Sequence, residues 1–403
     1  MVLYSGRVTH CPDDLASAVL AGHTTTREEA LDLLRTPPTG VPALVAAAHR
    51  LRTAAFGTEV KVNYLVNLRS GLCPEDCGYC SQRLGSAADI LTYSWLSPEE
   101  TLRQAQAGIA GGARRVCMVA SGRGPSTRDV ERVAGTVEAL KETHPEVEVC
   151  ACLGFVDEAK AQRLREAGVD AYNHNLNTSR AQYDSVCTTH TYDDRVDTVR
   201  ASREAGLSPC SGLITGMGES DEDLVDTVRE LVALDVDSIP VNFLMPFKGT
   251  PMEGRWELTP LRCLTVLCMV RFLAPRTEIR IAGGREIHLR SLQTQALYVA
   301  NSLFLGDYLT SQGQAARADL EMIRDAGLTL AGGTDLTALL ARIDADTATQ
   351  SSPTRPCDTE ACDSGTCGDN PTDGENPTDA GGHSVPPLAL RRRGAGTDLA
   401  PNA

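Results

Sequence analysis

The chain has 403 residues and a formal net charge of −15, with 42% hydrophobic and 23% charged residues, which is ordinary for a globular protein. The acidic balance argues against nonspecific binding to nucleic acid or to an anionic membrane. No run of about 18 apolar residues occurs, and the first residues lack the pattern of a secretion signal. We therefore expect a cytoplasmic protein without membrane or nucleic-acid partners, whose 14 cysteines indicate metal or redox chemistry rather than disulfides.

The N-terminal region, residues 1–55, is predicted to be a helical extension. Apolar residues recur at helical spacing in DDLASAVLAG and in TTREEALDLLRT. Thr26 precedes Glu28 and Glu29, so it is a plausible N-terminal cap of the second helix.

From about residue 58, short apolar runs alternate with amphipathic helical stretches. The strand-like runs lie at 60–68, 115–121, 147–154, 170–176, 207–215, 238–244, 278–284 and 300–306. Eight strands that alternate with helices predict an α/β fold, a parallel (β/α)8 TIM-type barrel over residues 56–330. A doubly wound open sheet is the alternative.

The composition changes after about residue 344. A short helical segment is expected at 331–344, and residues 345–403 are polar and rich in Pro, Gly, Ser and Thr before a basic end. Such a segment cannot bury enough apolar surface to fold alone, so we predict a disordered C-terminal tail. Its Cys357, Cys362 and Cys367 form a regular C-x4-C-x4-C that is either a site for metal or sulfur or incidental.

The strongest chemical signal is GLCPEDCGYC at 71–80, which places Cys73, Cys77 and Cys80 directly after the first predicted strand. Thiolates are the usual ligands of iron–sulfur clusters, and three of them hold three irons of a cubane and leave one iron open. A structural zinc site normally takes four protein ligands, and no fourth partner is close in sequence. The alternatives are zinc or a chance group of buried cysteines, and the spacing favours an oxygen-sensitive iron–sulfur enzyme.

This loop, after the first strand of a barrel, resembles the radical S-adenosylmethionine (SAM) superfamily. Five motifs together resemble the biotin synthase family over most of residues 55–310: GLCPEDCGYCSQ, YNHNLNTS (172–179), CSGLITGMGE (210–219), VNFLMPFKGTP (241–251) and RIAGGRE (280–286). The resemblance implies a sulfurtransferase that inserts sulfur into dethiobiotin to form biotin. A [4Fe–4S] cluster on Cys73, Cys77 and Cys80 would bind SAM and cleave it reductively to a 5′-deoxyadenosyl radical.

The sulfur source that the resemblance implies is a [2Fe–2S] cluster on Cys117, Cys150, Cys210 and Arg280. Each of these cysteines lies in a separate predicted strand, where alternate residues point into a barrel. Cys152 shares a face with Cys150, so geometry does not choose between them. A single strand cysteine is usually a small buried hydrophobe. Arginine is an unusual ligand because its guanidinium is normally protonated, so Arg280 would be a weak ligand or a charge partner.

The resemblance also assigns SAM contacts. Tyr79 is expected near the adenine, with Ile214 packed on the ring in a loop that ends at Glu219. Asn175 and Asn177 are expected at the ribose hydroxyls or the carboxylate of SAM. Many members of the family carry Asp where this chain has Asn177.

The ureido ring of dethiobiotin is expected to bind Asn173, Asn175 and Asn242. An amide side chain both donates and accepts hydrogen bonds, as a urea does. Turn capping at strand ends is the alternative role for each asparagine. His174 is expected to point away into packing.

The resemblance further implies a flavodoxin- or ferredoxin-type electron donor, iron–sulfur assembly proteins and a homodimer. Two other functions stay open: a radical SAM enzyme that only abstracts hydrogen or rearranges its substrate, and a noncatalytic iron–sulfur or zinc protein. Cys187, Cys263 and Cys268 are expected to be structural, and Cys11 lies near the terminus.

Overall fold

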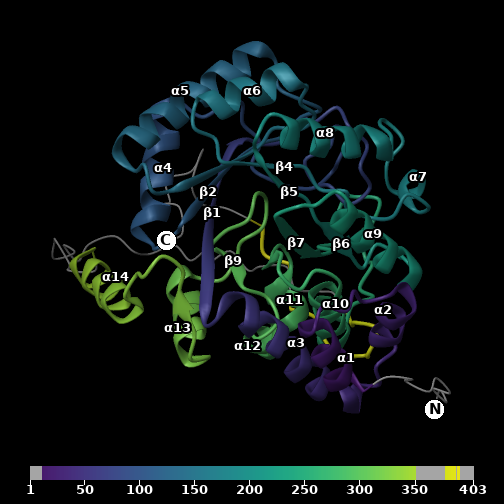
Figure 1. Cartoon of the computed structure of the whole chain (residues 1–403). Coiled ribbons are helices and arrows are strands. Elements are labelled where there is room, and N and C mark those ends of the chain that lie inside the picture. The colour runs from purple at the N-terminus through teal and green to yellow at the C-terminus, as the bar shows by residue number, and fades with distance from the viewer. Residues whose placement is uncertain (1–10, 351–376, 387, 391–403) are drawn as a thin grey trace, which may run out of the picture.

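A computed structural model describes the protein over residues 11–350, 377–386 and 388–390 (Figure 1). Most of the predicted disordered tail, including Cys357, Cys362 and Cys367, lies outside the described residues. None of the described helices has the length and apolar character that a membrane crossing requires.

Three helices form the N-terminal part: α1 (Pro12–Leu20), α2 (Arg27–Leu34) and α3 (Val41–Phe56), with a 3-10 turn at Pro38–Gly40 before α3. The predicted cap at Thr26 is confirmed, because its hydroxyl accepts from the Glu29 amide while the Glu29 carboxylate accepts from the Thr26 amide. Helices α2 and α3 pack on α10 (Pro260–Leu273), in which residues 263–273 are all buried. An apolar helix of this kind needs cover on its outer face, and the N-terminal helices provide it.

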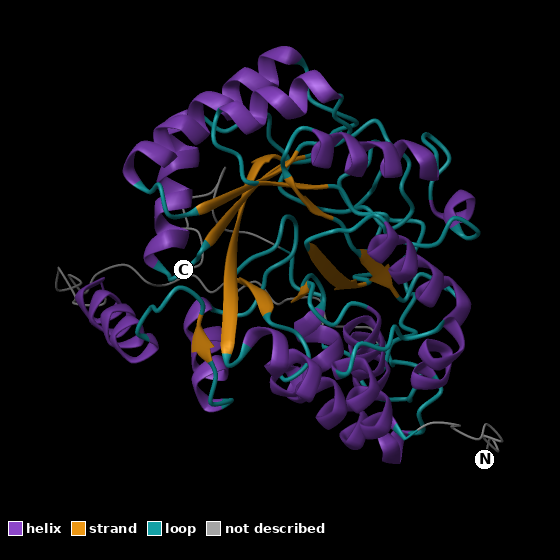
Figure 2. Ribbon diagram, viewed as in Figure 1, coloured by secondary structure: helices purple, strands orange, loops and turns teal. Residues whose placement is uncertain are grey.

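The predicted barrel is confirmed (Figure 2). Every strand pairs in parallel with its neighbour in the order β1-β2-β3-β4-β5-β7-β8-β9, and β9 pairs with β1, which closes the ring and excludes the open sheet. Strand β6 pairs with β7, and β10 adds to the edge of β1. The strands are β1 (Glu59–Arg69), β2 (Arg115–Ala120), β3 (Glu148–Cys152), β4 (Ala171–Asn173), β5 (Ser208–Cys210), β6 (Leu213–Thr215), β7 (Ser238–Phe243), β8 (Glu278–Ile281), β9 (Ser302–Leu305) and β10 (Thr329–Leu330).

The remaining helices lie mainly outside the ring of strands (Figure 2). Side chains of serine, threonine or aspartate cap the first turns of α4, α5, α6, α8, α9 and α10. Besides α10, the remaining helices are α4 (Pro98–Ala110), α5 (Thr127–Thr143), α6 (Glu158–Glu166), α7 (Tyr183–Val186), α8 (Tyr192–Glu204), α9 (Asp221–Ala233), α11 (Arg285–Leu289), α12 (Gln293–Leu297), α13 (Ala316–Asp325) and α14 (Leu336–Gln350), with a 3-10 turn at Arg290–Leu292.

The fifth barrel position is interrupted between β5 and β6, where the sequence predicted one continuous strand. A Cβ atom on Gly212 would lie 1.9 Å from the carbonyl oxygen of Pro240, so only glycine fits this close approach. The Gly212 amide donates to the Asn175 side chain at 3.0 Å instead of to a strand. The interruption therefore turns backbone donors toward the end of the barrel where active sites form.

Candidate active site

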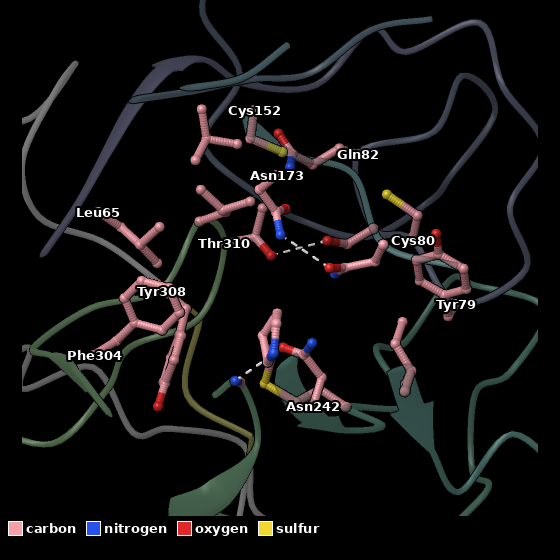
Figure 3. A pocket seen from close by; sticks show the side chains of 18 of the residues that line it. Leu65, Tyr79, Cys80, Gln82, Cys152, Asn173, Asn242, Phe304, Tyr308 and Thr310 are labelled. Atoms are coloured by element: carbon pink, nitrogen blue, oxygen red, sulfur yellow. Dashed lines mark hydrogen bonds between the residues drawn. The ribbon is translucent and has the colours of Figure 1, made fainter. Parts of the chain in front are cut away.

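Two adjoining cavities open at the carboxyl end of the barrel strands. The inner cavity has a volume of about 240 Å³ and the outer cavity about 260 Å³, a size suited to small molecules. They are continuous, because both are lined by Tyr79, Cys80, Gln82, Cys152, Asn173, Asn175, Ile214 and Asn242. In the view of Figure 3, Leu65, Phe304 and Tyr308 lie on one side of the inner cavity and Tyr79 and Cys80 on the other.

The three cysteines of the loop after β1 all line the outer cavity. The loop is held by its own backbone: the Cys73 amide donates to the Gln82 carbonyl, and the Cys80 amide to the Cys77 carbonyl, both at 3.1 Å. The Gly78 amide ties it to Val186 at 2.8 Å. None of these cysteines is in a disulfide. Three available thiols on one cavity wall fit a cluster that takes three protein ligands and leaves one iron open.

The thiols of the outer cavity differ in acidity. A hydrogen bond with Cys187, at 3.6 Å between the sulfurs, and the positive charge of Arg195 lower the pKa of Cys77. Burial raises the pKa of Cys73 and raises that of Cys80 to about 11. Cys187, which the sequence suggested to be only structural, therefore contacts one of the loop thiols directly.

Arg195 is a feature that the sequence analysis missed. Its guanidinium is buried beside the outer cavity and donates to the hydroxyl of Tyr183, to the carbonyl of Asn175 at 2.7 Å and to Nε2 of His190 at 2.9 Å. It also donates to the Cys77 thiol at 3.8 Å, and among the described residues it forms no ion pair with a carboxylate. A buried cation without a carboxylate partner is costly, so this position favours an anionic ligand.

Helical spacing is the signal that could have revealed Arg195. In α8, Tyr192, Val196 and Val199 are buried, and Arg195 belongs to the same face. An arginine within the buried stripe of a helix whose other arginines, Arg200 and Arg203, are exposed is a candidate for an internal role.

The ligand atoms of Cys77, Cys187 and His190 lie within 4.8 Å of one another, a grouping that suggests a metal site. However, Nε2 of His190 accepts from Arg195, and its Nδ1 lies 2.6 Å from the Glu75 carboxylate, to which it donates in that tautomer. No lone pair of His190 is then available. The nearby guanidinium also opposes a dication, so we do not assign a metal to this group.

Three cysteines from separate strands meet beside the inner cavity: Cys117 and Cys150 line it, and Cys210 contacts Cys150. Cys117 and Cys150 are register partners on β2 and β3, and the Cys150 thiol makes hydrogen bonds with those of Cys117 and Cys210. These bonds, together with the cations of Arg280 and Arg115, lower the pKa values of Cys117 and Cys210. Cys152 lies two residues further along β3 and borders both cavities. Contact with the other two thiols therefore distinguishes Cys150 from Cys152.

Arg280 lies on β8 beneath these thiols and is 1% exposed. It donates to Glu278 at 2.5 Å, and one of its nitrogens lies 3.8 Å from the Cys210 sulfur. Burial alone would lower the pKa of Arg280, but Glu278 and the Cys210 thiolate outweigh burial and raise the pKa. The guanidinium is thus a cation facing the thiols, which favours the charge-partner alternative over a deprotonated ligand.

The asparagines line the walls between the two cavities. Asn173 donates to the Asn175 side chain at 3.0 Å and contacts the Cys210 sulfur at 3.2 Å. Asn242 accepts from the Gly283 amide at 3.1 Å and donates to the Leu213 carbonyl at 3.3 Å. These bonds fix the orientation of the Asn173 and Asn242 amides. Both side chains bond to neighbouring groups, as the turn-capping alternative expects, and both also face the cavities.

Asn177 occupies the left-handed region, with φ of 70°, which asparagine tolerates better than most residues. Its amide donates to the Tyr79 hydroxyl at 2.6 Å, which places two expected SAM contacts side by side at the outer cavity. Glu219 accepts from Thr215 and from the Gly216 amide, each at 2.7 Å, and so closes its own loop.

His174 meets the packing expectation only in part. Its ring packs on Phe155 with centroids 4.8 Å apart, as packing predicts, but it also lines the outer cavity. Burial holds its pKa well below the usual value, so the ring is neutral. Its Nε2 has no hydrogen-bond partner among the described residues.

Comparison with known proteins identifies the family. Residues 68–231 match the radical SAM superfamily, and residues 240–329 match the biotin and thiamin synthesis associated domain. A biotin synthase of Streptomyces avermitilis is 58% identical over 384 residues, covering 94% of this chain and 95% of that protein. The chain belongs to the biotin synthase family. A biotin synthase of Saccharopolyspora erythraea is 56% identical over 389 residues, and the alignment covers 96% of this chain and 98% of that protein.

Membership in the biotin synthase family makes this protein a radical SAM enzyme, with a [4Fe–4S] cluster and SAM as cofactors. The fold is shared with solved structures of methylornithine synthase, at a TM-score of 0.70 and 20% identity, covering 82% of this chain and 99% of that one. The FeFe-hydrogenase maturase HydG from Carboxydothermus hydrogenoformans has a TM-score of 0.69 at 16% identity, covering 81% and 80%. At these identities the likeness shows the fold alone.

Proposed function

We propose that this enzyme inserts one sulfur atom between two unactivated carbons of dethiobiotin and so forms biotin, the last step of biotin biosynthesis. The observation that carries the proposal is the pair of cysteine sets on one continuous cavity. Cys73, Cys77 and Cys80 lie at its outer part and Cys117 and Cys150 at its inner part, where Cys210 contacts Cys150. A radical enzyme that only removed hydrogen would have no need of the inner set.

Cys73, Cys77 and Cys80 would hold the [4Fe–4S] cluster. When bound, the cluster and SAM supply a carbon radical that removes hydrogen from an unactivated C–H bond. Arg195 would neutralise the carboxylate of SAM, because it is a buried cation without a carboxylate partner among the described residues. Asn175 and Asn177 would bind the polar groups of SAM, with Tyr79 and Ile214 beside the adenine.

Cys117, Cys150 and Cys210 would hold a [2Fe–2S] cluster as the sulfur donor, with Arg280 beside it as a charge partner or weak ligand. Mutual contact of the three thiols and the lowered pKa values of Cys117 and Cys210 suit ligands that bind iron as thiolates. The cation of Arg280 would offset the negative charge that three thiolates bring into a buried site.

Dethiobiotin would occupy the inner cavity. Asn173 and Asn242, with Asn175, offer donors and acceptors for the ureido ring, and Leu65 and Phe304 offer apolar surface for the alkyl chain. The protein's own contribution is to place the substrate between the two cysteine sets and to keep water out. A flavodoxin- or ferredoxin-type electron donor, iron–sulfur assembly proteins and a homodimer in the cytoplasm belong to the same proposal.

The test is an anaerobic assay of the reconstituted enzyme with SAM, a reductant and dethiobiotin, in which mass spectrometry measures biotin and 5′-deoxyadenosine. We expect both products, and neither when SAM is omitted. Iron analysis of the same sample separates two clusters per chain from one. Deoxyadenosine without biotin, in a sample that carries both clusters, would overturn dethiobiotin as the substrate while leaving the radical chemistry in place.

A further inference from the structure

Part of the C-terminal region folds back onto the barrel, although its composition predicts disorder. We define the C-terminal strap as residues 377–386 and 388–390, which are drawn in yellow in Figure 1. The strap lies beyond residue 329, where the matched domain ends. The proposed reaction assigns nothing to it.

The strap is organised by a turn around Asp379. The Asp379 carboxylate accepts from the Gly381 and His383 amides at 2.9 Å, and the Gly382 amide donates to the Asp379 carbonyl at the same distance. The Val385 amide closes the turn onto Pro377 at 2.8 Å. These bonds give a segment without an apolar core of its own a defined shape.

Two attachments hold the strap to the barrel. The first is an ion pair between Asp379 and Arg290, which directly follows α11; the Asp379 side chain is 1% exposed and the Arg290 side chain 22%. Val385 beside it is buried at 1% exposure. A buried aspartate that pairs with an arginine contributes more than a surface ion pair.

The second attachment is to the loop after β9. The Gln312 amide donates to the Ala389 carbonyl at 2.9 Å, and Ser311 forms an antiparallel bridge with Leu390. The strap thus adds a short strand to the outer side of this loop. Pairing of backbone with backbone restricts the loop regardless of side-chain identity.

That loop forms a wall of the inner cavity. Tyr308, Leu309 and Thr310 line the cavity, and they immediately precede the residues that pair with the strap. The Thr310 hydroxyl lies 2.9 Å from that of Ser81, which follows Cys80 of the cysteine loop (Figure 3 shows Thr310 on the cavity wall). The loop therefore contacts the strap on one side, and the inner cavity and the cysteine loop on the other.

We propose that the C-terminal strap is a positioning element of the substrate site: it holds the 307–312 loop against the inner cavity and thereby sets the affinity for the substrate. The proposal rests on the proposed function, in which this cavity binds dethiobiotin. Arg290 and Asp379 act through the loop and do not touch the substrate. The strap would be needed for affinity, whereas the cysteine sites would form without it.

Two variants of Arg290 test the inference on the full-length, cluster-loaded enzyme and leave the Asp379 turn intact. Arg290→Asp should weaken dethiobiotin binding about ten-fold, measured by anaerobic equilibrium dialysis with SAM, whereas Arg290→Lys, which keeps the charge, should retain most of the affinity. Iron content and SAM affinity should stay at the wild-type level. Arg317→Asp, which breaks an exposed ion pair with Asp344, is the matched control and should change none of these values.

Hydrogen exchange at the Gln312 amide reports whether the strap is attached. We expect faster exchange in Arg290→Asp and protection close to wild type in Arg290→Lys. Fast exchange with unchanged dethiobiotin affinity would overturn the positioning role, and unchanged exchange in Arg290→Asp would overturn the Arg290–Asp379 anchor. If the wild-type enzyme itself fails to bind dethiobiotin, the proposed function is wrong instead, and the strap proposal ends with it.

Discussion

The two cysteine sets of the cavity are assembled in opposite ways. The outer set comes from one stretch of ten residues, 71–80, whose backbone hydrogen bonds shape the loop locally. The inner set comes from β2, β3 and β5, which are separated by tens of residues and meet only because the barrel closes. The outer site is therefore specified by a motif and the inner site by the whole fold.

Exposure separates the two sets as well. Cys117, Cys150 and Cys210 are 4%, 1% and 1% exposed, whereas Cys73 and Cys80 are partly exposed at the outer cavity. The greater exposure of the outer set fits the proposed function, in which this set would begin each reaction with SAM and an electron donor. The buried inner set would supply the sulfur.

The largest effect is expected from the outer set. Cys77→Ala should remove the ligand whose thiol has the lowered pKa and should abolish both deoxyadenosine and biotin, a loss on the order of a thousand-fold or more. The measurement is product formation together with iron content and the electron paramagnetic resonance of the reduced cluster. Cys263→Ala, a buried cysteine of α10, is the control and should keep both products. Normal deoxyadenosine formation by Cys77→Ala would contradict the assignment.

The inner set should separate the two products. Cys150→Ala should lose biotin almost completely while deoxyadenosine stays within about three-fold of wild type, because only the sulfur donor is disturbed. Cys152→Ala provides the matched control on the same strand and should still form biotin, since Cys152 does not share the hydrogen bonds that link Cys150 to Cys117 and Cys210. The reverse pattern would move the ligand to Cys152.

Much of the fold could be predicted from the sequence because parallel strands buried on both faces appear as short apolar runs, as in β2, where all six residues are buried. The break between β5 and β6 could not be predicted, because it depends on the approach of Gly212 to Pro240 across the barrel. Pairing between strands distant in sequence decides such details.

The site shows the same limit. The outer cysteines could be found from their spacing, whereas Arg195 and the Cys187–Cys77 contact depend on α8 and the loop before it folding against the cysteine loop. Composition predicted disorder for residues 345–403, but the strap is attached by one buried ion pair and a few backbone bonds, which composition does not report. Local chemistry is readable from the sequence, and contacts over long sequence distances are not.

Arg195 provides a test of the outer site with an intermediate effect. Arg195→Leu should weaken SAM binding about 10- to 100-fold, because charged hydrogen bonds contribute about 1.5–3 kcal/mol. Arg195→Lys should be less severe, since an ammonium keeps the charge but does not reach Tyr183, Asn175 and His190 together. The dissociation constant of SAM is measured on cluster-loaded protein of verified iron content. Equal losses for Leu and Lys would argue that shape, and not charge, is what the site requires.

The smallest effect is expected at Asn177, whose amide donates to the Tyr79 hydroxyl at the outer cavity. Asn177→Asp should change SAM affinity by no more than about three-fold, because the Tyr79 hydroxyl, which now accepts from the asparagine amide, can turn and donate to a carboxylate. Aspartate also tolerates the φ of 70° at this position. Asn177→Val should be worse by about ten-fold, since a branched side chain is strained there and makes no hydrogen bond. If the aspartate variant bound SAM as poorly as the valine variant, the donor to Tyr79 itself would be essential, and the outer site would depend on this asparagine rather than on a general polar contact.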